Sequence, residues 1–254
     1  MEDAVLVEHR NGIAIITINR PQARNAVNRA VTLGVAAAVD ELDARPDLTV
    51  GILTGAGGSF SAGMDLKAFL AGEDVGLAGR GLAGICQRPP RKPMIAAVEG
   101  WALAGGFEIA LACDLIVAAE NATFGIPEVK RGLVAGAGGL LRLPRRLPPA
   151  IAMELALTGD PLPAQDAHRY GLVNAVTPPG GALDGALALA GRITPNGPLA
   201  VAASREILAN ASDWSLEEGF VRQEAIVARI VVSADAREGA LAFAEKRPAQ
   251  WTGR

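Results

Sequence analysis

The chain has few of the residues that build metal sites and disulfide frameworks. Its 254 residues include two cysteines, Cys86 and Cys113, and two histidines, His9 and His168. Zinc sites and disulfide scaffolds need several such residues at close, regular spacings. These four are scattered along the sequence, so we expect no metal site and no disulfide framework.

Long hydrophobic runs are also lacking. The best apolar stretch, residues 94–115, is interrupted by Glu99 and Glu108, whereas a membrane-spanning helix needs about 20 predominantly apolar residues. The first residues, Met1-Glu2-Asp3-Ala4-Val5, contain no basic stretch leading into an apolar run, as a secretory signal would. We therefore expect a soluble, cytoplasmic protein that does not bind membranes.

No block of like charge is present. The 24 basic and 27 acidic residues are dispersed and give a net charge of −3, which argues against nucleic acid as the partner. Hydrophobic residues make up 50% of the chain, so disorder is excluded and the length is ample for a large buried core.

Hydrophobic patterning predicts strands and helices in alternation through about residue 180. Residues 5–9 and 13–18 are β-rich and are joined by Asn11-Gly12, a strong signal for a hairpin. Apolar residues recur at helical spacing within residues 27–44, and the glycine-rich residues 71–84 predict low order. The other predicted elements are strands at 49–54, 93–98 and 115–118 and a helix at 107–112.

Beyond about residue 182 the pattern is helical only, with predicted helices at 183–193, 199–208, 216–232 and 236–245. Alternating strands and helices indicate an α/β core with helices around parallel or mixed strands. We therefore divide the chain into an α/β core, residues 1–182, and a helical C-terminal region, residues 183–254. This region is too apolar to stay solvated, so it packs on a neighbour or folds back.

The sequence gives little support for a nucleotide-binding or a hydrolase function. Residues 79–84 match G-x-G-x-x-G but follow a glycine-rich loop instead of a strand. The sequence contains neither G-x-S-x-G nor G-x-x-x-x-G-K-[ST], and His168 has no evident nucleophilic partner.

Two glycine-containing stretches, residues 60–66 and 97–108, each follow a predicted strand and precede a helix. Free backbone N–H groups at such helix starts could converge if the strands are neighbours, and two donors make an oxyanion hole. The alternative is that these glycines only permit tight turns.

Two glutamates stand beside glycine or proline: Glu108 after Gly105-Gly106, and Glu128 after Pro127. A pair of positioned carboxylates suits the addition or removal of water next to a carbonyl. Structural alternatives exist for both, since Glu108 could satisfy helix N-terminal amides and Glu128 could pair with Lys130 or Arg131 on the surface.

In their order along the chain, these motifs resemble the crotonase family, also called the enoyl-CoA hydratase/isomerase family. The resemblance implies a spiral of ββα units with a C-terminal helical trimerisation region, assembled as a homotrimer or a dimer of trimers. The matching segments are Asn19-Arg20-Pro21, Arg24-Asn25-Ala26, Phe60 to Leu66, Gly105 to Glu108, Cys113-Asp114, Phe124 to Glu128, Gly136 to Gly139 and Ala242 to Arg247.

The resemblance also implies the site residues. The N–H groups of Met64 and Gly105 correspond to the oxyanion-hole donors that hold the thioester oxygen. Glu108 corresponds to the residue that positions water and takes its proton, and Glu128 to the one that protonates the α-carbon. The substrate is an acyl-CoA thioester, so no separate cofactor is expected. Residues matching family CoA or substrate contacts are Arg24, Ala26, Ala62, Gly63, Asp65, Leu66, Gly106 and Pro127.

The expected reaction is reversible hydration of a 2-enoyl-CoA thioester. Residues 141–151 and 240–247 are similar to carnitinyl-CoA dehydratases, which is a narrower alternative. An enoyl-CoA isomerase and a non-catalytic acyl-CoA sensor also stay open. Ala104 and Ala135 depart from the family's usual glycine and proline, which bears on the shape of the acyl pocket.

Overall fold

The chain begins with the hairpin that its Asn-Gly pair predicts. In the computed structural model, which describes residues 3–254, β1 (Val5–Arg10) pairs antiparallel with β2 (Ile13–Ile18). Asn11 and Gly12 have φ values of 50° and 79°. Positive φ at both central residues defines the two-residue turn that suits twisted strands.

A six-stranded sheet forms the centre of the molecule, in the order β1-β2-β3-β6-β8-β11. All neighbouring strands after the hairpin run parallel. The other strands of this sheet are β3 (Val50–Gly55), β6 (Met94–Val98), β8 (Leu115–Ala119) and β11 (Ala175–Thr177).

Two smaller sheets lie beside it. One contains β10 (Leu162–Pro163), β9 (Thr123–Gly125) and β7 (Trp101–Leu103), in that order. The other is a hairpin of β4 (Gly76–Leu77) and β5 (Gly81–Leu82). The prediction of low order for residues 71–84 missed this hairpin.

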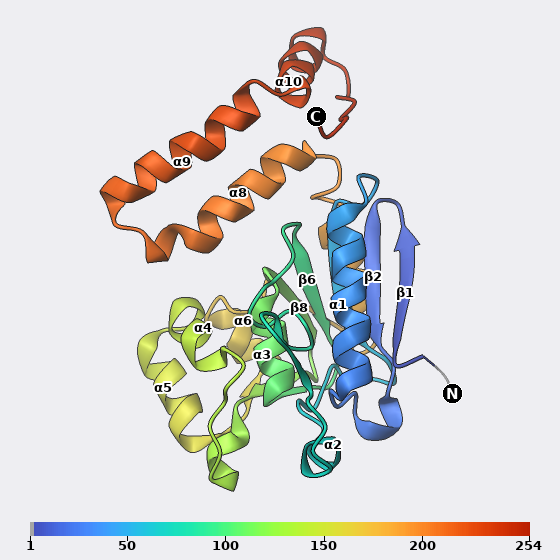
Figure 1. The fold of residues 1–254 in the computed structure, drawn as a ribbon, viewed down its shortest axis with the longest axis vertical. Helices are drawn as coiled ribbons and strands as arrows, with labels where there is room; N and C mark the ends of the chain where they lie inside the picture. The colour runs from blue at the N-terminus through green and yellow to red at the C-terminus, as the bar shows by residue number, and fades with distance from the viewer. Residues whose placement is uncertain (1–2) are drawn as a thin grey trace.

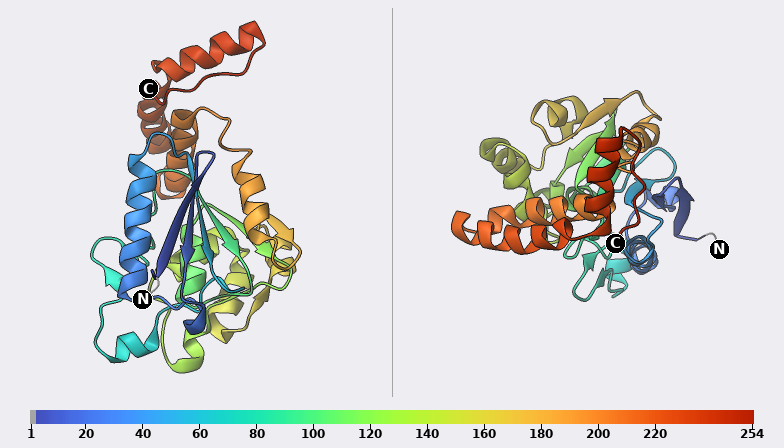
Figure 2. Two further views of the ribbon diagram at one scale, coloured as in Figure 1. Left: turned by 90° about the vertical axis from the view of Figure 1, so that its right-hand side faces the viewer. Right: turned by 90° about the horizontal axis from the view of Figure 1, so that it is seen from above.

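Helices cover both faces of the main sheet, with α1 (Arg29–Ala44) on one and α7 (Ala182–Ala190) on the other (Figure 2). Alternate strand residues point to opposite faces. Ile16 therefore packs in the cluster that contains the α1 side chains, whereas Ile15 packs in the cluster with α7. The sheet is buried on both sides, as continuous apolar strands predict.

The C-terminal helices extend away from the sheet (Figure 1). They are α8 (Pro198–Asn210), α9 (Leu216–Val231) and α10 (Ala234–Glu245), which confirms the helical prediction. Helix α9 starts with a capping box between Ser215 and Glu218. Helix α7 packs on the sheet, so only the three helices after it project. The predicted boundary between an α/β core and a helical region at residue 182 stays a prediction.

The remaining helices are short and connect the strands. They are α2 (Leu66–Leu70), α3 (Gly105–Ala112), α4 (Gly139–Arg146), α5 (Pro149–Thr158) and α6 (Ala164–Arg169). Three 3-10 turns accompany them: η1 (Pro21–Ala23), η2 (Pro127–Arg131) and η3 (Ala211–Asp213). Within residues 3–254 no helix is both long and apolar enough to cross a membrane.

Candidate active site

The two glycine-containing loops leave the same end of the sheet. β3 and β6 are parallel neighbours, with Thr54 opposite Ala97, so the chain segments after them start side by side. A bridge between Ser61 and Ala102 joins the two segments again. The carboxyl ends of parallel strands are where α/β proteins place their sites.

Two free backbone amides meet at this point. The N–H groups of Met64 and Gly105 donate to no protein acceptor within residues 3–254. They are close together, since a Cβ atom added to Gly105 would lie 3.3 Å from the Met64 nitrogen. The pair is therefore available to bind an oxygen that becomes negative during a reaction.

Gly63 makes this close approach possible. Its φ is +90°, and an added Cβ would lie 2.7 Å from the Gly105 nitrogen. Any larger residue would therefore collide with one of the two free amides. A serine supports the same loop, because the Ser61 hydroxyl accepts from the Gly63 N–H at 3.1 Å and donates to the Asn25 carbonyl at 2.8 Å.

Ala104, immediately before α3, has a strained backbone. Its φ is 52° and its ψ is −130°, a conformation that glycine adopts far more readily than alanine. Its own N–H donates to the Gly125 carbonyl at 2.8 Å, which ties the strained turn to β9. The turn orients the Gly105 N–H at the start of α3.

Glu108 lies in α3 and is 3% exposed. Its Oε1 accepts from the N–H groups of Ala137 and Gly139, each at 2.8 Å. Burial raises the pKa of Glu108, and the two amide hydrogen bonds partly offset this rise. The carboxylate satisfies amides at the start of α4, not those of its own helix, and its Oε2 stays unpaired within the described chain.

Glu128 lies at the start of η2 with its Oε2 buried and without a hydrogen-bond partner in residues 3–254. Burial raises the pKa of this carboxyl, its own backbone amide partly offsets the rise, and the charge of Glu108 adds to it. The proposed surface pair with Lys130 is wrong, because Lys130 binds Asp160 at 2.6 Å. No ion pair joins Glu128 to Arg131 in the described chain either.

The amides and both carboxylates line one cavity of about 680 Å³. This is large enough for part of a substrate the size of a thioester with a pantetheine arm. Its walls come from the segments around α2, β5, β7, α3 and η2. The lining residues are Arg24, Ala62, Met64, Leu66, Val75, Gly76, Gly81, Leu82, Gln87, Trp101, Leu103, Ala104, Gly105, Glu108, Pro127, Glu128, Arg131, Leu133, Val134, Gly136 and Ala137.

The sequence-predicted CoA contacts divide into two groups. Arg24, Ala62, Leu66 and Pro127 line the cavity, and the guanidinium of Arg24 lies 5.3 Å from the Trp101 ring centroid. Their contact with CoA stays a prediction.

The other four predicted contacts lie outside the lining: Ala26, Gly63, Asp65 and Gly106. Asp65 caps α2 and binds Arg20 at 2.9 Å, and Gly106 packs against the Ser61 backbone. In the structure these residues shape the loops that carry Met64 and Gly105.

Sequence reasoning did not assign several contacts in and around the cavity. The amides of Ala137 and Gly139 hold Glu108, although the sequence identified their glycine-rich segment only as a motif. Trp101, Leu133 and Arg131 also line the cavity. The described residues contain no group of three or more side chains placed to hold a metal ion.

Two free amides and two carboxylates in one cavity are an arrangement that suits enzymes acting on carbonyl compounds, because the amides can bind an oxygen that becomes negative. The comparisons agree with this class. A model of the enoyl-CoA hydratase/isomerase family matches residues 8–254, and the chain belongs to this family. The predictions of a crotonase-like fold and of a hydratase-type enzyme are thereby confirmed.

Relatives cover the whole chain. It is 64% identical to an enoyl-CoA hydratase from Mycobacterium marinum, with a TM-score of 0.98 and full coverage of both chains. A carnitinyl-CoA hydratase from Mycobacterium avium is 46% identical, with a TM-score of 0.81 and full coverage of both. A carnitinyl-CoA dehydratase from Proteus mirabilis is 42% identical over 100% of both sequences.

Proposed function

We propose that the protein catalyses reversible hydration of a 2-enoyl-CoA thioester to the 3-hydroxyacyl-CoA. The observation that carries the proposal is the meeting of two free amides, Met64 and Gly105, with Glu108 and Glu128 around one cavity. A donor pair alone would suit many reactions of acyl groups. Two carboxylates with raised pKa values favour reactions that move protons at two positions.

In this mechanism the thioester oxygen accepts hydrogen bonds from Met64 and Gly105. Glu108 takes a proton from water through its free Oε2 while the water oxygen bonds to C3. The C2–C3 double-bond electrons move toward the carbonyl, and the resulting enolate is stabilised by the two amides. Glu128 then donates a proton to C2, and exchange of the proton between the two carboxyls through solvent restores the starting enzyme.

The different surroundings of the carboxyls support these roles. Glu108 accepts two amide hydrogen bonds, which favour its ionised form as a base. Glu128 has a buried, unpartnered oxygen, which favours its protonated form as an acid.

The test is to mix the protein with crotonyl-CoA and follow loss of the conjugated enone absorbance. Glu108→Gln and Glu128→Gln are each expected to lower kcat by about 10²-fold or more, since general acid or base catalysis contributes that much. Binding of free CoA is expected to stay unchanged in both variants, which shows that the cavity is intact. Turnover that survives in either variant would contradict the two-carboxylate mechanism.

A second candidate is dehydration of carnitinyl-CoA, favoured by the names of relatives that are 42–46% identical to the chain. It uses the same water chemistry on an acyl group with a trimethylammonium. Comparing crotonyl-CoA with crotonobetainyl-CoA as substrates separates the two candidates.

We also propose that the chain assembles as a homotrimer or a dimer of trimers. The projecting helices support this, because they leave large apolar side chains exposed, including Val232 at 84% and Phe243 at 87%. Such exposed apolar surfaces mark interaction sites.

A further inference from the structure

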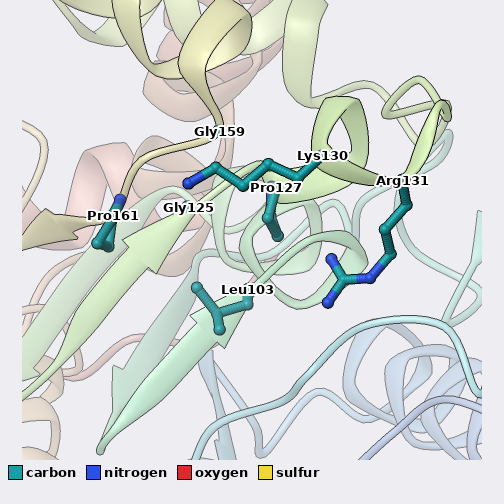
Figure 3. Close-up of a pocket in the computed structure, with 7 residues that line it drawn as sticks. All are labelled: Leu103, Gly125, Pro127, Lys130, Arg131, Gly159 and Pro161. Carbon is teal, nitrogen blue, oxygen red and sulfur yellow. The ribbon is translucent and has the colours of Figure 1, made fainter.

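A second, smaller cavity adjoins the one described above. Its volume is about 350 Å³. It shares three lining residues, Leu103, Pro127 and Arg131, with the larger cavity. Figure 3 shows these three side chains around the smaller cavity, with Arg131 reaching from the end of η2 into the space beside Leu103. The two cavities therefore meet at an arginine.

Arg131 stands on the same side of η2 as Glu128. In a 3-10 turn, side chains three residues apart are eclipsed and lie about 6 Å apart along the axis. Both residues line the larger cavity, and the charge of Arg131 opposes the rise in the pKa of Glu128. The guanidinium is thus placed about one turn from the group expected to protonate C2.

Arg131 is exposed, and its charge acts on the carboxyl of Glu128 without forming an ion pair in the described chain. No ion pair within residues 3–254 includes it, whereas the adjacent Lys130 binds Asp160 at 2.6 Å. In Figure 3 the Lys130 side chain runs toward Pro161, away from Arg131. An unpaired guanidinium in a substrate cavity is suited to bind a carboxylate of the ligand through two parallel hydrogen bonds.

We infer that Arg131 makes the enzyme selective for 2-enoyl-CoA thioesters whose acyl chain ends in a carboxylate. This inference rests on the proposed function and names its substrate class. The carboxylate would lie in the region where the cavities meet, a short distance beyond C2. The phosphates of CoA are a poorer match, because the pantetheine arm holds them many bonds from the thioester that the two amides bind.

The same residue disfavours a cationic acyl group. A trimethylammonium beside the Arg131 guanidinium experiences like-charge repulsion. Arg131 therefore argues against carnitinyl thioesters as the substrate of this chain, although the names of several relatives include them.

The experiment measures kcat/KM for trans-5-carboxy-2-pentenoyl-CoA and for its neutral counterpart, trans-2-hexenoyl-CoA. Three proteins are compared: the parent, Arg131→Met and Arg192→Met. The parent is expected to prefer the carboxylate substrate, and Arg131→Met to reduce the ratio of the two constants about tenfold, mainly through the carboxylate substrate. Arg192→Met is the matched control, because Arg192 is an exposed arginine that lines neither cavity, and it is expected to change the ratio less than about twofold.

Three results would overturn the inference. The first is a parent enzyme that prefers the neutral substrate, and the second is a ratio that Arg131→Met leaves unchanged. The third is an equal loss for both substrates together with weaker inhibition by free CoA, which would place Arg131 on CoA itself.

A binding measurement distinguishes failure of the proposed hydration from failure of the inferred selectivity. Binding of the saturated thioesters 5-carboxypentanoyl-CoA and hexanoyl-CoA is measured by calorimetry on the same three proteins. If the parent hydrates neither enoyl substrate but binds the carboxylate thioester more tightly in an Arg131-dependent way, the reaction is wrong and the selectivity stands. Equal binding of the two saturated thioesters overturns the selectivity.

Discussion

Glu108 and Glu128 have the same functional group in different surroundings. One oxygen of Glu108 accepts two backbone amides, whereas Glu128 has a buried oxygen with no partner in the described chain. Burial raises both pKa values. Two amides of a distant segment, those of Ala137 and Gly139, partly offset the rise for Glu108, whereas for Glu128 the offsetting amide is its own. One carboxyl is thus suited to act as a base and the other as an acid near neutral pH.

The unpartnered Glu128 is expected to destabilise the fold at neutral pH. Its folded pKa is raised above the unfolded value near 4.5, so the folded state binds more protons and loses stability as pH rises through this window. Glu128→Gln is expected to increase the free energy of unfolding at pH 7 by about 1 kcal/mol. Urea unfolding should show this gain at pH 7 and little of it at pH 4; an equal gain at both pH values would contradict the assignment.

Gly139 leaves room for the Glu108 side chain. A Cβ added there would lie 2.8 Å from Glu108 Cγ and 3.1 Å from its Oε1. Gly139→Ala is therefore expected to displace the carboxylate and lower kcat about 10²-fold in steady-state hydration assays. Gly191→Ala is the control, since an added Cβ makes only ordinary contacts at 3.4 Å or more. Similar losses in both variants would show a general effect of the added methyl group.

The start of α3 combines function with backbone strain. Ala104, with φ of 52°, precedes the Gly105 amide, and most of this strain is relieved by glycine. Ala104→Gly is expected to stabilise the protein by about 1 kcal/mol, which raises Tm by about 2–4 °C for a chain of this size. Scanning calorimetry measures the shift. A lower Tm would mean that the alanine methyl packs well enough to outweigh the strain.

Elements with local signals were predictable. The Asn11-Gly12 turn, the apolar periodicity of α1 and the continuous apolar strands each reflect neighbouring residues. Strands of two or three residues, such as β7 and β9, carry no such periodicity and exist through pairing with distant segments. Their prediction requires the tertiary fold.

The candidate site also combines residues that the sequence predicts with contacts that only the tertiary structure shows. The resemblance assigned Glu108 and Glu128 from motifs, but the amides that hold Glu108 come from residues about 30 positions away in sequence. The position of Arg131 between the two cavities was also invisible, because their walls include segments distant in the sequence. Contacts of this kind are set by packing and cannot be read from spacing.

The molecule as a whole consists of a sheet core and helices that project from it (Figure 1). The projecting helices expose apolar side chains. If these helices form the proposed assembly interface, charges placed on them should dissociate it. Phe220→Asp combined with Phe243→Asp is expected to lower the mass measured by sedimentation equilibrium, whereas Glu217→Gln, a polar change in α9, should not. A parent chain that sediments as a monomer would contradict the proposed assembly.

The most direct test of two-carboxylate hydration is isotope incorporation. The protein is incubated with crotonyl-CoA in H₂¹⁸O and, separately, in D₂O, and the product is analysed by mass spectrometry. We predict one ¹⁸O at C3 and one deuterium at C2, with both lost in Glu108→Gln and Glu128→Gln. Deuterium entering the acyl chain without ¹⁸O would instead identify an isomerase and contradict the proposed hydration.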